Sequence, residues 1–311
     1  MASIGIVGTG NVGMAAAAAV FHRRLASTLT LVDLDQRRAE GEAMDLMHGQ
    51  ALVGPCTVRA GGFDELAGAS VVVVSAGVGQ RPGESRLDLL ARNVEVFAAI
   101  VDQLDRHAPE AVVLVATNPV DVLTLAFQEL SSRPRRRVIG TGTLLDTARL
   151  RALVGQRYGV DPQSVHAYVL GEHGDSEFVP WSIASIGGSP LVDAEPLGLA
   201  WDGPAMADLV ERVRRAAYEI IDRKGYTNWA IGAVIAELVG MVLRDERTVV
   251  PVSVRPHGAY GLDGPCLSLP ARVGADGVDA VVAPPLTEAE QRDLEHSAAT
   301  LAALAADLRL G

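Results

Sequence analysis

The stretch IGIVGTGNVG, residues Ile4–Gly13, determines the fold that we predict for this chain. It joins a short β-branched run to a GxGxxG motif that opens an Ala-rich helical segment. In that context Gly8 permits a tight turn, Gly10 lets the backbone approach a pyrophosphate, and Gly13 allows close packing of helix on strand. The helix N-terminus adds N–H donors for the phosphates, so the segment predicts a dinucleotide site.

Asp33 ends the next β-branched run, 20 residues after Gly13. A carboxylate at this position would bond the adenine ribose hydroxyls and repel a 2′-phosphate, so the pattern favours NAD over NADP. Arg38 is expected either near the adenosine or on a solvated helix face. The alternative interpretation is an ordinary turn before a helix, followed by an unrelated Asp at a strand end.

Outward from this motif, the first 140 residues alternate short apolar runs with helical patterns. Runs of about four to six β-branched residues bounded by Gly, Asp, Asn or Pro are typical of buried parallel strands. Their alternation with helices predicts an α/β fold with a doubly wound parallel sheet. The expected strands are Ile4–Val7, Leu29–Val32, Thr57–Arg59, Val71–Val74, Val112–Val115 and Val138–Ile139, and the helices are Val12–Phe21, Arg37–Met47, Leu87–Leu104 and Val120–Leu130.

The pattern changes after residue 142. We therefore predict a dinucleotide-binding domain over residues 1–142 and a second domain, α/β or α+β, over 143–311. The last helix should begin with a capping box between Thr287 and Glu290. Helices are expected over Leu145–Arg157, Pro204–Asp222, Asn228–Leu243 and 287–309, a strand over Val165–Leu170, and several short strands over 248–283.

Composition excludes several classes of protein. The chain has 311 residues, of which 38 are acidic and 27 basic, and its net charge of -11 argues against nucleic-acid or anionic-membrane binding. Its one lysine, Lys224, leaves no Gly-Lys-Ser/Thr phosphate loop. Cys56 and Cys266 are too few for a disulfide framework or a four-thiolate zinc site, and we expect small buried or surface residues there. We see no signal peptide or long apolar run, and so expect a soluble cytoplasmic protein.

A histidine lies among glycines in Gly171–Ser176, GEHGDS, directly after an expected strand. Alone, His173 would more often be a structural residue. However, Asp146 and Arg149 are three residues apart on an expected helix, so they share one face. An Asp beside a His holds the imidazole tautomer and raises the pKa of the ring, and an Arg grips a carboxylate with two parallel hydrogen bonds.

Two more segments follow strand ends, where ligands bind in open α/β sheets. Residues 77–86, GVGQRPGESR, contain glycines at Gly77, Gly79 and Gly83 and form a candidate lid that would bring Arg86 in as a charge stabiliser. Asn118, within TNPV, would bond a substrate oxygen and the nicotinamide region.

In their order along the chain, these motifs resemble the lactate/malate dehydrogenase family over nearly the whole sequence. The resemblance implies a Rossmann domain, an α/β catalytic domain, NAD as cofactor and a homotetramer. We expect no metal, because the sequence shows no clustered ligand set. The matching segments are GTGNVG, DLDQRRAEGEAMDLMHG, GQRPGESRLDLLARN, ATNPVDV, GTGTLLDTAR, GEHGDSE and KGYTNWAIG.

The resemblance also implies a role for each site residue. His173 is the general acid/base, Asp146 orients it, and Arg86 polarises the substrate carbonyl after the lid closes. Arg149 binds the substrate carboxylate, with Gln80, Asn118 and Thr227 beside the substrate. The residues expected along the cofactor are Gly8, Gly10, Val12, Gly13, Asp33, Arg38, Gly77, Val78, Ala116, Asn118, Thr141 and Ile231.

Gln80 is the residue that separates the two substrate classes of the family. The malate-type members commonly carry Arg at this lid position, where it pairs the second carboxylate of oxaloacetate. Here Arg81 is adjacent, but GQRPGESR matches the lactate-type members, and a neutral Gln leaves a second carboxylate unpaired. We therefore expect reversible NADH-dependent reduction of pyruvate to L-lactate. The alternatives are a malate or other 2-hydroxy acid dehydrogenase and a non-catalytic dinucleotide sensor, which would need none of the acid–base residues.

Arg151 and His166 suggest regulation. Arg151 lies two residues past Arg149 on a different side of the helix, and His166 lies seven residues before His173. Both match positions that bind fructose 1,6-bisphosphate across a subunit interface in bacterial members of this type. Doubled by two-fold symmetry, they would form a four-cation phosphate site, so activation by this ligand is expected. The alternative is an interface Arg and a structural His.

Overall fold

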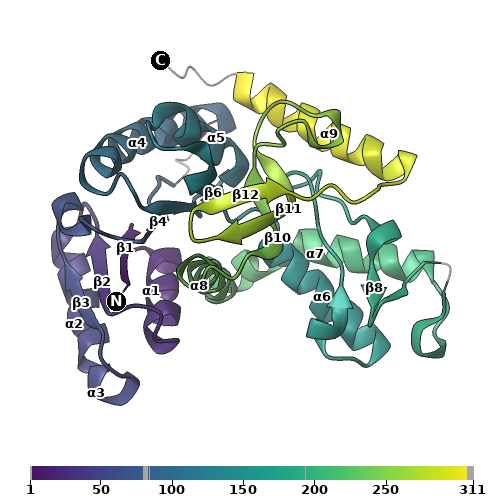
Figure 1. Cartoon of the computed structure of the whole chain (residues 1–311), viewed down its shortest axis with the longest axis horizontal. Coiled ribbons are helices and arrows are strands. Elements are labelled where there is room, and N and C mark those ends of the chain that lie inside the picture. The colour runs from purple at the N-terminus through teal and green to yellow at the C-terminus, as the bar shows by residue number, and fades with distance from the viewer. Residues whose placement is uncertain (1, 80–82, 84, 193, 307–311) are drawn as a thin grey trace.

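The computed structural model describes residues 2–79, 83, 85–192 and 194–306. Three antiparallel strands, β10 (Thr248–Val254), β11 (Leu267–Gly274) and β12 (Gly277–Val281), extend a six-stranded parallel sheet. The parallel strands are β1 (Ser3–Val7), β2 (Thr28–Val32), β3 (Thr57–Ala60), β4 (Val71–Val74), β5 (Val112–Val115) and β6 (Val138–Gly140). The order β3–β2–β1–β4–β5–β6–β10–β11–β12 confirms the predicted doubly wound fold (Figure 1).

The predicted long helices are confirmed, and Thr287 and Glu290 make the predicted capping box. A separate small sheet contains β7 (Val165–His166), β8 (Ser185–Ile186) and β9 (Ser189–Pro190). The α-helices are α1 (Asn11–His22), α2 (Gln36–His48), α3 (Gln50–Val53), α4 (Arg86–His107), α5 (Val120–Leu130), α6 (Leu144–Tyr158), α7 (Gly203–Lys224), α8 (Trp229–Leu243) and α9 (Glu288–Ala306).

The largest apolar core is continuous across residue 142. It contains residues of the parallel strands, such as Ile6 and Leu114, and residues of the antiparallel extension, such as Val252 and Leu269. The two parts meet where Ser253 of β10 pairs with Gly140 of β6. A second, smaller core lies among α6, α7 and the small sheet. The division at residue 142 therefore stays a prediction, because neither the main sheet nor its core breaks there.

Helix α8 crosses from the C-terminal half of the chain onto α1, as Figure 1 shows. A Cβ at Gly232 of α8 would lie 2.7 Å from the carbonyl carbon of Ala15, so only glycine permits this approach. The contact brings the beginning of α8 next to the helix that follows the GxGxxG motif.

The prediction of a strand over Val165–Leu170 is wrong for most of its length, because β7 ends at His166. The backbone of Val169 bonds to threonine side chains instead of to a neighbouring strand. Its N–H donates to Oγ1 of Thr147 in α6, and its oxygen accepts from Oγ1 of Thr143, the residue before α6. These bonds tie the segment that leads to His173 onto α6.

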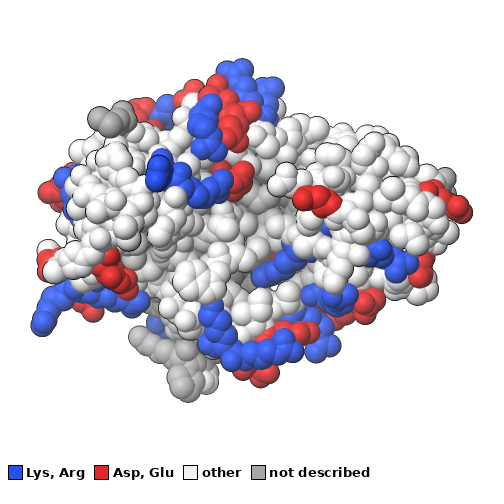
Figure 2. Space-filling model, turned by 90° about the horizontal axis from the view of Figure 1, so that it is seen from below, with Lys and Arg blue, Asp and Glu red and all other residues white. Residues whose placement is uncertain are grey.

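On the face of the molecule seen from below, basic and acidic side chains are interleaved, and neither sign covers the surface alone (Figure 2). Both cysteines, Cys56 and Cys266, are buried free thiols, which is the first of the two expected placements, buried or surface. No helix within the described ranges combines the length and the apolar character needed to cross a membrane.

Candidate functional site

The carboxyl ends of the parallel strands bring the predicted nucleotide loops to one edge of the sheet. Each loop begins with a backbone N–H that bonds to the last residue of the neighbouring strand: Gly8 to Val32, Ser75 to Val7, Ala116 to Val74, and Thr141 to Val115. The predicted cofactor residues around these positions, from Gly8 to Thr141 in sequence, therefore lie in adjacent loops along that edge.

Gly8 and Gly13 have the backbone and packing roles predicted for them. Gly8 has a φ of +98°, and a Cβ on Gly13 would lie 1.9 Å from the carbonyl oxygen of Gly8. A Cβ on Gly10 would meet no atom within 4 Å, which leaves open space at the N-terminus of α1. A helix N-terminus beside open space fits the pyrophosphate of a dinucleotide.

Asp33 is held in place by the GxGxxG turn. Its Oδ2 accepts hydrogen bonds from the backbone N–H of Thr9 at 2.6 Å and from the Thr9 hydroxyl at 2.9 Å. Burial opposes ionisation, but these bonds and one from the Asp35 N–H lower the pKa of Asp33 overall. The carboxylate is thus ionised at neutral pH, as a ribose-binding residue requires. Arg38 is exposed on α2 and lies 4.0 Å from Glu42.

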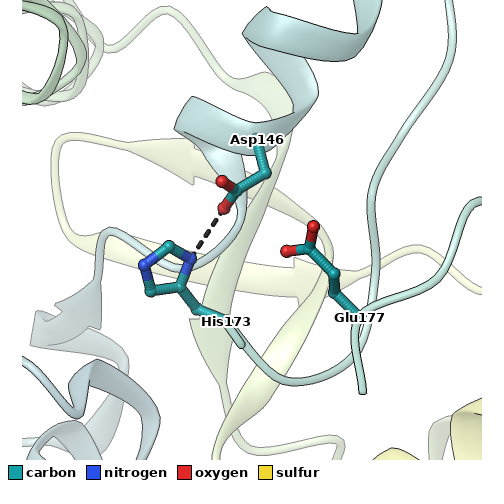
Figure 3. Close-up of side chains that lie close together, drawn as sticks. All are labelled: Asp146, His173 and Glu177. Carbon is teal, nitrogen blue, oxygen red and sulfur yellow. Dashed lines mark hydrogen bonds and ion pairs between the residues drawn. The ribbon is translucent and has the colours of Figure 1, made fainter. Parts of the chain in front are cut away.

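His173 and Asp146 form the chemical centre of the site. Nδ1 of His173 and Oδ2 of Asp146 are 2.7 Å apart, and Figure 3 shows this bond between α6 and the loop after Gly171. Asp146 is 3% exposed and His173 is 25% exposed, so the imidazole reaches solvent while its partner does not. Because Nδ1 is engaged, Nε2 is the nitrogen left for a substrate.

The electrostatics favour a charged pair. Burial disfavours the imidazolium, but the hydrogen bond and charge of Asp146, with a further contribution from Asp121, raise the pKa of His173 to about 9. Burial would raise the pKa of Asp146, but the bond from His173 and the charges of His173 and Arg149 lower it overall. The imidazole is therefore protonated at neutral pH beside an ionised carboxylate.

Arg149 lies on the same face of α6, as predicted. Its Nη1 donates to Oδ1 of Asp146 at 2.8 Å, and its side chain is 16% exposed. Asp146 thus bonds a cation through each oxygen. Contact between Arg149 and a substrate carboxylate stays a prediction.

The remaining predicted site residues are distributed around this centre. Asn118 is exposed after β5, and the N–H of Val78 donates to Asn93 Oδ1 at 2.9 Å, which fixes the start of the predicted lid. Thr227 and Ile231 are half-buried around the beginning of α8. Arg86 is the first residue of α4, after the Ser85 cap. Gln80 and the neighbouring Arg81 lie outside the described residues, as do Pro82 and Glu84 of the predicted lid.

The Arg151 side chain packs against the segment that directly follows His166. Nε of Arg151 donates to the backbone oxygen of Ala167 at 3.0 Å, and its guanidinium lies 5.5 Å from the ring centroid of Tyr168. His166, the preceding residue of that segment, is exposed. The structure therefore places Arg151 beside the main chain next to His166, while a shared phosphate ligand stays a prediction.

Two buried carboxyl groups lie beside His173 that were not predicted from the sequence. Asp121 Oδ2 accepts the backbone N–H of His173 at 2.8 Å, and burial raises the pKa of Asp121 to about 6. Burial and the charge of Asp146 raise the pKa of Glu177 to about 8. The available signal was an acidic residue within an otherwise apolar stretch: VDVLTLAF around Asp121, and EFVPW from Glu177 onward.

Asp146, His173 and Glu177 also form a possible metal-ligand group, since one ligand atom from each lies within 4.8 Å of the others. However, each oxygen of Asp146 already accepts a hydrogen bond from a cationic side chain. We therefore interpret the group as a hydrogen-bonded acid–base site.

Residues 2–140 match the family description "lactate/malate dehydrogenase, NAD binding domain", and residues 143–307 match "lactate/malate dehydrogenase, alpha/beta C-terminal domain". The chain is 58% identical to an L-lactate dehydrogenase of Salinibacter ruber over 310 residues, which is 99% of this chain and 98% of that protein. It is 48% identical to an L-lactate dehydrogenase of Thermus aquaticus over 306 residues, 98% and 99% of the two chains. A crystal structure of a minor L-lactate dehydrogenase from Enterococcus mundtii in a ligands-bound form superposes with a TM-score of 0.96 at 38% identity, covering 100% of this chain and 99% of that one.

Proposed function

The chain belongs to the lactate/malate dehydrogenase family, and we propose that His173 and Asp146 are the acid–base pair of an NAD-dependent L-lactate dehydrogenase. The reaction is the reversible reduction of pyruvate to L-lactate. The observation that carries the residue roles is the 2.7 Å bond between His173 Nδ1 and Asp146 Oδ2. The malate-type alternative is not favoured, because the relatives described above are L-lactate dehydrogenases.

The protein supplies the proton chemistry of this reaction. When bound, the nicotinamide gives or takes the hydride at C2 of the substrate. Nε2 of His173 donates a proton to the carbonyl oxygen during pyruvate reduction and accepts the hydroxyl proton during lactate oxidation. Asp146 remains ionised, holds the tautomer and stabilises the imidazolium. Because the pKa of His173 is raised to about 9, the proton donor is present at neutral pH.

Three further residues bind and polarise the substrate. Arg149 grips the substrate carboxylate with the N–H groups that its bond to Asp146 leaves free. Arg86 stabilises the negative charge that develops on the carbonyl oxygen. Gln80 leaves room for the methyl group and offers no cation to a second carboxylate. Residues 1–142 bind the cofactor and residues 143–311 complete the substrate pocket.

The active assembly is a homotetramer in the cytoplasm. Large apolar side chains on α2, α7 and α8 are exposed in the single chain, and such surfaces mark protein–protein contacts. They include Met44, which is 61% exposed, and Trp229, which is 70% exposed. Fructose 1,6-bisphosphate binds Arg151 and His166 of two facing subunits and activates the enzyme by favouring the substrate-competent tetramer.

NADH oxidation by the purified chain, with pyruvate and oxaloacetate assayed side by side, tests the assignment. We expect kcat/KM for pyruvate to exceed that for oxaloacetate. The reverse preference would assign the malate-type reaction, and NADH binding without turnover on either substrate would indicate a dinucleotide sensor.

A further inference from the structure

Glu177 is a buried carboxyl group that the chemistry described above does not use. It follows His173 by four residues, is 3% exposed, and directs its carboxyl toward the Asp146–His173 pair (Figure 3). One ligand atom from each of the three residues lies within 4.8 Å of the others. Within the described parts of the chain, no hydrogen bond or ion pair engages the Glu177 carboxyl. Its interaction with the pair is therefore one of charge across a short distance.

Charged groups from three directions face Glu177. Asp146 and Arg149 approach from α6. Arg214 of α7 donates from Nη2 to the backbone oxygen of Glu177 at 2.5 Å, which fixes the main chain at this position. Glu172 precedes it in the loop and is engaged by the Ser176 hydroxyl. Of these neighbours, Asp146 is the one that most disfavours a second negative charge on Glu177.

A cavity of about 730 Å³ lies on the other side of Glu177. Its far wall is formed by α9, with Asp293, His296 and Thr300, and Glu172 and Arg214 also line it. Because Glu177 lines this cavity, the cavity offers a route by which a proton could leave the carboxyl without passing through the substrate pocket. Glu177 lines this cavity, whereas His173 and Asp146 do not, so Glu177 lies between the cavity and the acid–base pair.

We propose that Glu177 is a positioning residue that keeps His173 protonated through its own negative charge as the pH rises. At neutral pH the carboxyl is neutral, because burial and Asp146 raise its pKa to about 8. Above that pH it releases its proton to water in the cavity, and the new charge stabilises the imidazolium within 4.8 Å. Lactate oxidation needs neutral His173, so the same charge moves the rise of the lactate oxidation rate to higher pH. This inference rests on the proposed acid–base role of His173.

The test is the pH profile of Glu177→Gln, which removes the ionisation at nearly constant volume. We expect the alkaline fall of kcat/KM for pyruvate to move to lower pH by about one unit, since a nearby opposite charge shifts a pKa by about that much. The acid limb of lactate oxidation should move in the same direction, and NADH affinity should be unchanged. Asp293→Asn, on the opposite wall of the cavity, is the matched control and should keep the parental profile.

A direct titration of His173 separates this inference from the proposed function. In ¹⁵N-histidine-labelled protein, the His173 imidazole midpoint should be about one pH unit lower in Glu177→Gln than in the parent. If Glu177→Gln does not fold, Glu177→Met can be measured in its place. It is a second neutral variant of similar length and should give the same shift of the His173 midpoint. An unchanged midpoint in a folded neutral variant would overturn the role of Glu177 and leave the acid–base role of His173 intact. Normal turnover of His173→Asn would instead remove the proposed function itself.

Discussion

The backbone N–H of His173 donates a hydrogen bond to Oδ2 of Asp121 at 2.8 Å, across 52 residues of sequence. Asp121 is 2% exposed in the first turn of α5, and its Oδ1 has no hydrogen-bond partner in the described structure. The bond fastens the loop that carries His173 to the helix following β5. Ionisation of a buried carboxyl with one unsatisfied oxygen costs free energy. The ionisation of Asp121 should therefore lower the free energy of unfolding.

Replacement of Asp121 by Asn keeps the hydrogen-bond acceptor and removes the ionisation. The pKa of the folded-state carboxyl is raised from 3.8 to about 6, so its contribution to stability is complete below pH 4 and is lost as the pH rises through 6. The variant should therefore gain up to about 3 kcal/mol relative to the parent between pH 4 and 7. Denaturant unfolding at both pH values measures this. Asp208→Asn, at an exposed position of α7, is the control and should show no such gain. If the free energy of unfolding of Asp121→Asn differs from that of the parent by the same amount at pH 4 and pH 7, the prediction is contradicted.

His173→Asn removes the proton donor and acceptor. It should reduce kcat by about two orders of magnitude or more, the usual worth of general acid catalysis, while NADH binding followed by fluorescence stays near normal. In the parent, pyruvate reduction should decline as the pH rises past about 9, because the donor loses its proton there. His107→Asn, at the end of α4, is the control. Near-normal turnover of His173→Asn would exclude the residue from the mechanism.

Arg149→Lys keeps the charge but loses the planar fork. The KM for pyruvate should rise at least tenfold while NADH affinity is unchanged, because an ammonium cannot bond both carboxylate oxygens in parallel. Steady-state kinetics with varied pyruvate measure the effect, and Arg157→Lys, farther along α6, should behave like the parent. An unaltered KM would show that Arg149 serves only Asp146.

Gln80→Arg adds a cation that can pair the second carboxylate of oxaloacetate. We expect kcat/KM to rise for oxaloacetate and to fall for pyruvate, with the ratio moving at least tenfold. Gln103→Arg adds the same charge at a half-buried position of α4 and should leave the ratio unchanged. If the ratio in Gln80→Arg does not move toward oxaloacetate, Gln80 does not contact the far end of the substrate.

Arg151→Gln tests regulation. At low enzyme concentration, fructose 1,6-bisphosphate should lower the KM of the parent for pyruvate, and the variant should lose this response because its share of the phosphate site is gone. Pyruvate saturation with and without the effector, at pH 6 and 7.5, measures both. No effect on the parent would reject activation, and an undiminished effect on the variant would place the site elsewhere.

The parts of the molecule that are predictable from sequence depend on local backbone geometry. Gly8 and Gly13 identify the turn because a Cβ on Gly8 would clash with the backbone of Ala76, and a Cβ on Gly13 would clash with the backbone of Gly8. The three-residue spacing of Asp146 and Arg149 likewise puts both side chains on one face of any helix that contains them. Asp33 is recognisable from its position at the end of a β-branched run.

What could not be predicted depends on contacts between distant segments. The segment after His166 fails to form a strand because the hydroxyls of Thr143 and Thr147 bond the Val169 backbone. Asp121 and Glu177 acquire their importance only when α5 and the loop after Gly171 bring them beside His173. Neither their partners nor their pKa values follow from the spacing of residues along the chain.

The pairing of Gly140 with Ser253 has a consequence for attempts to divide the protein. Residues 1–142 expressed alone would expose the free edge of β6. An exposed strand edge can pair with a strand of another molecule, which leads to aggregation. A Cβ on Gly140 would lie 2.7 Å from the Cβ of Ser253, so this edge is shaped for one specific neighbour. Chimeras that exchange the nucleotide half between relatives therefore need to carry β10, β11 and β12 with it, even though these strands are encoded more than a hundred residues downstream.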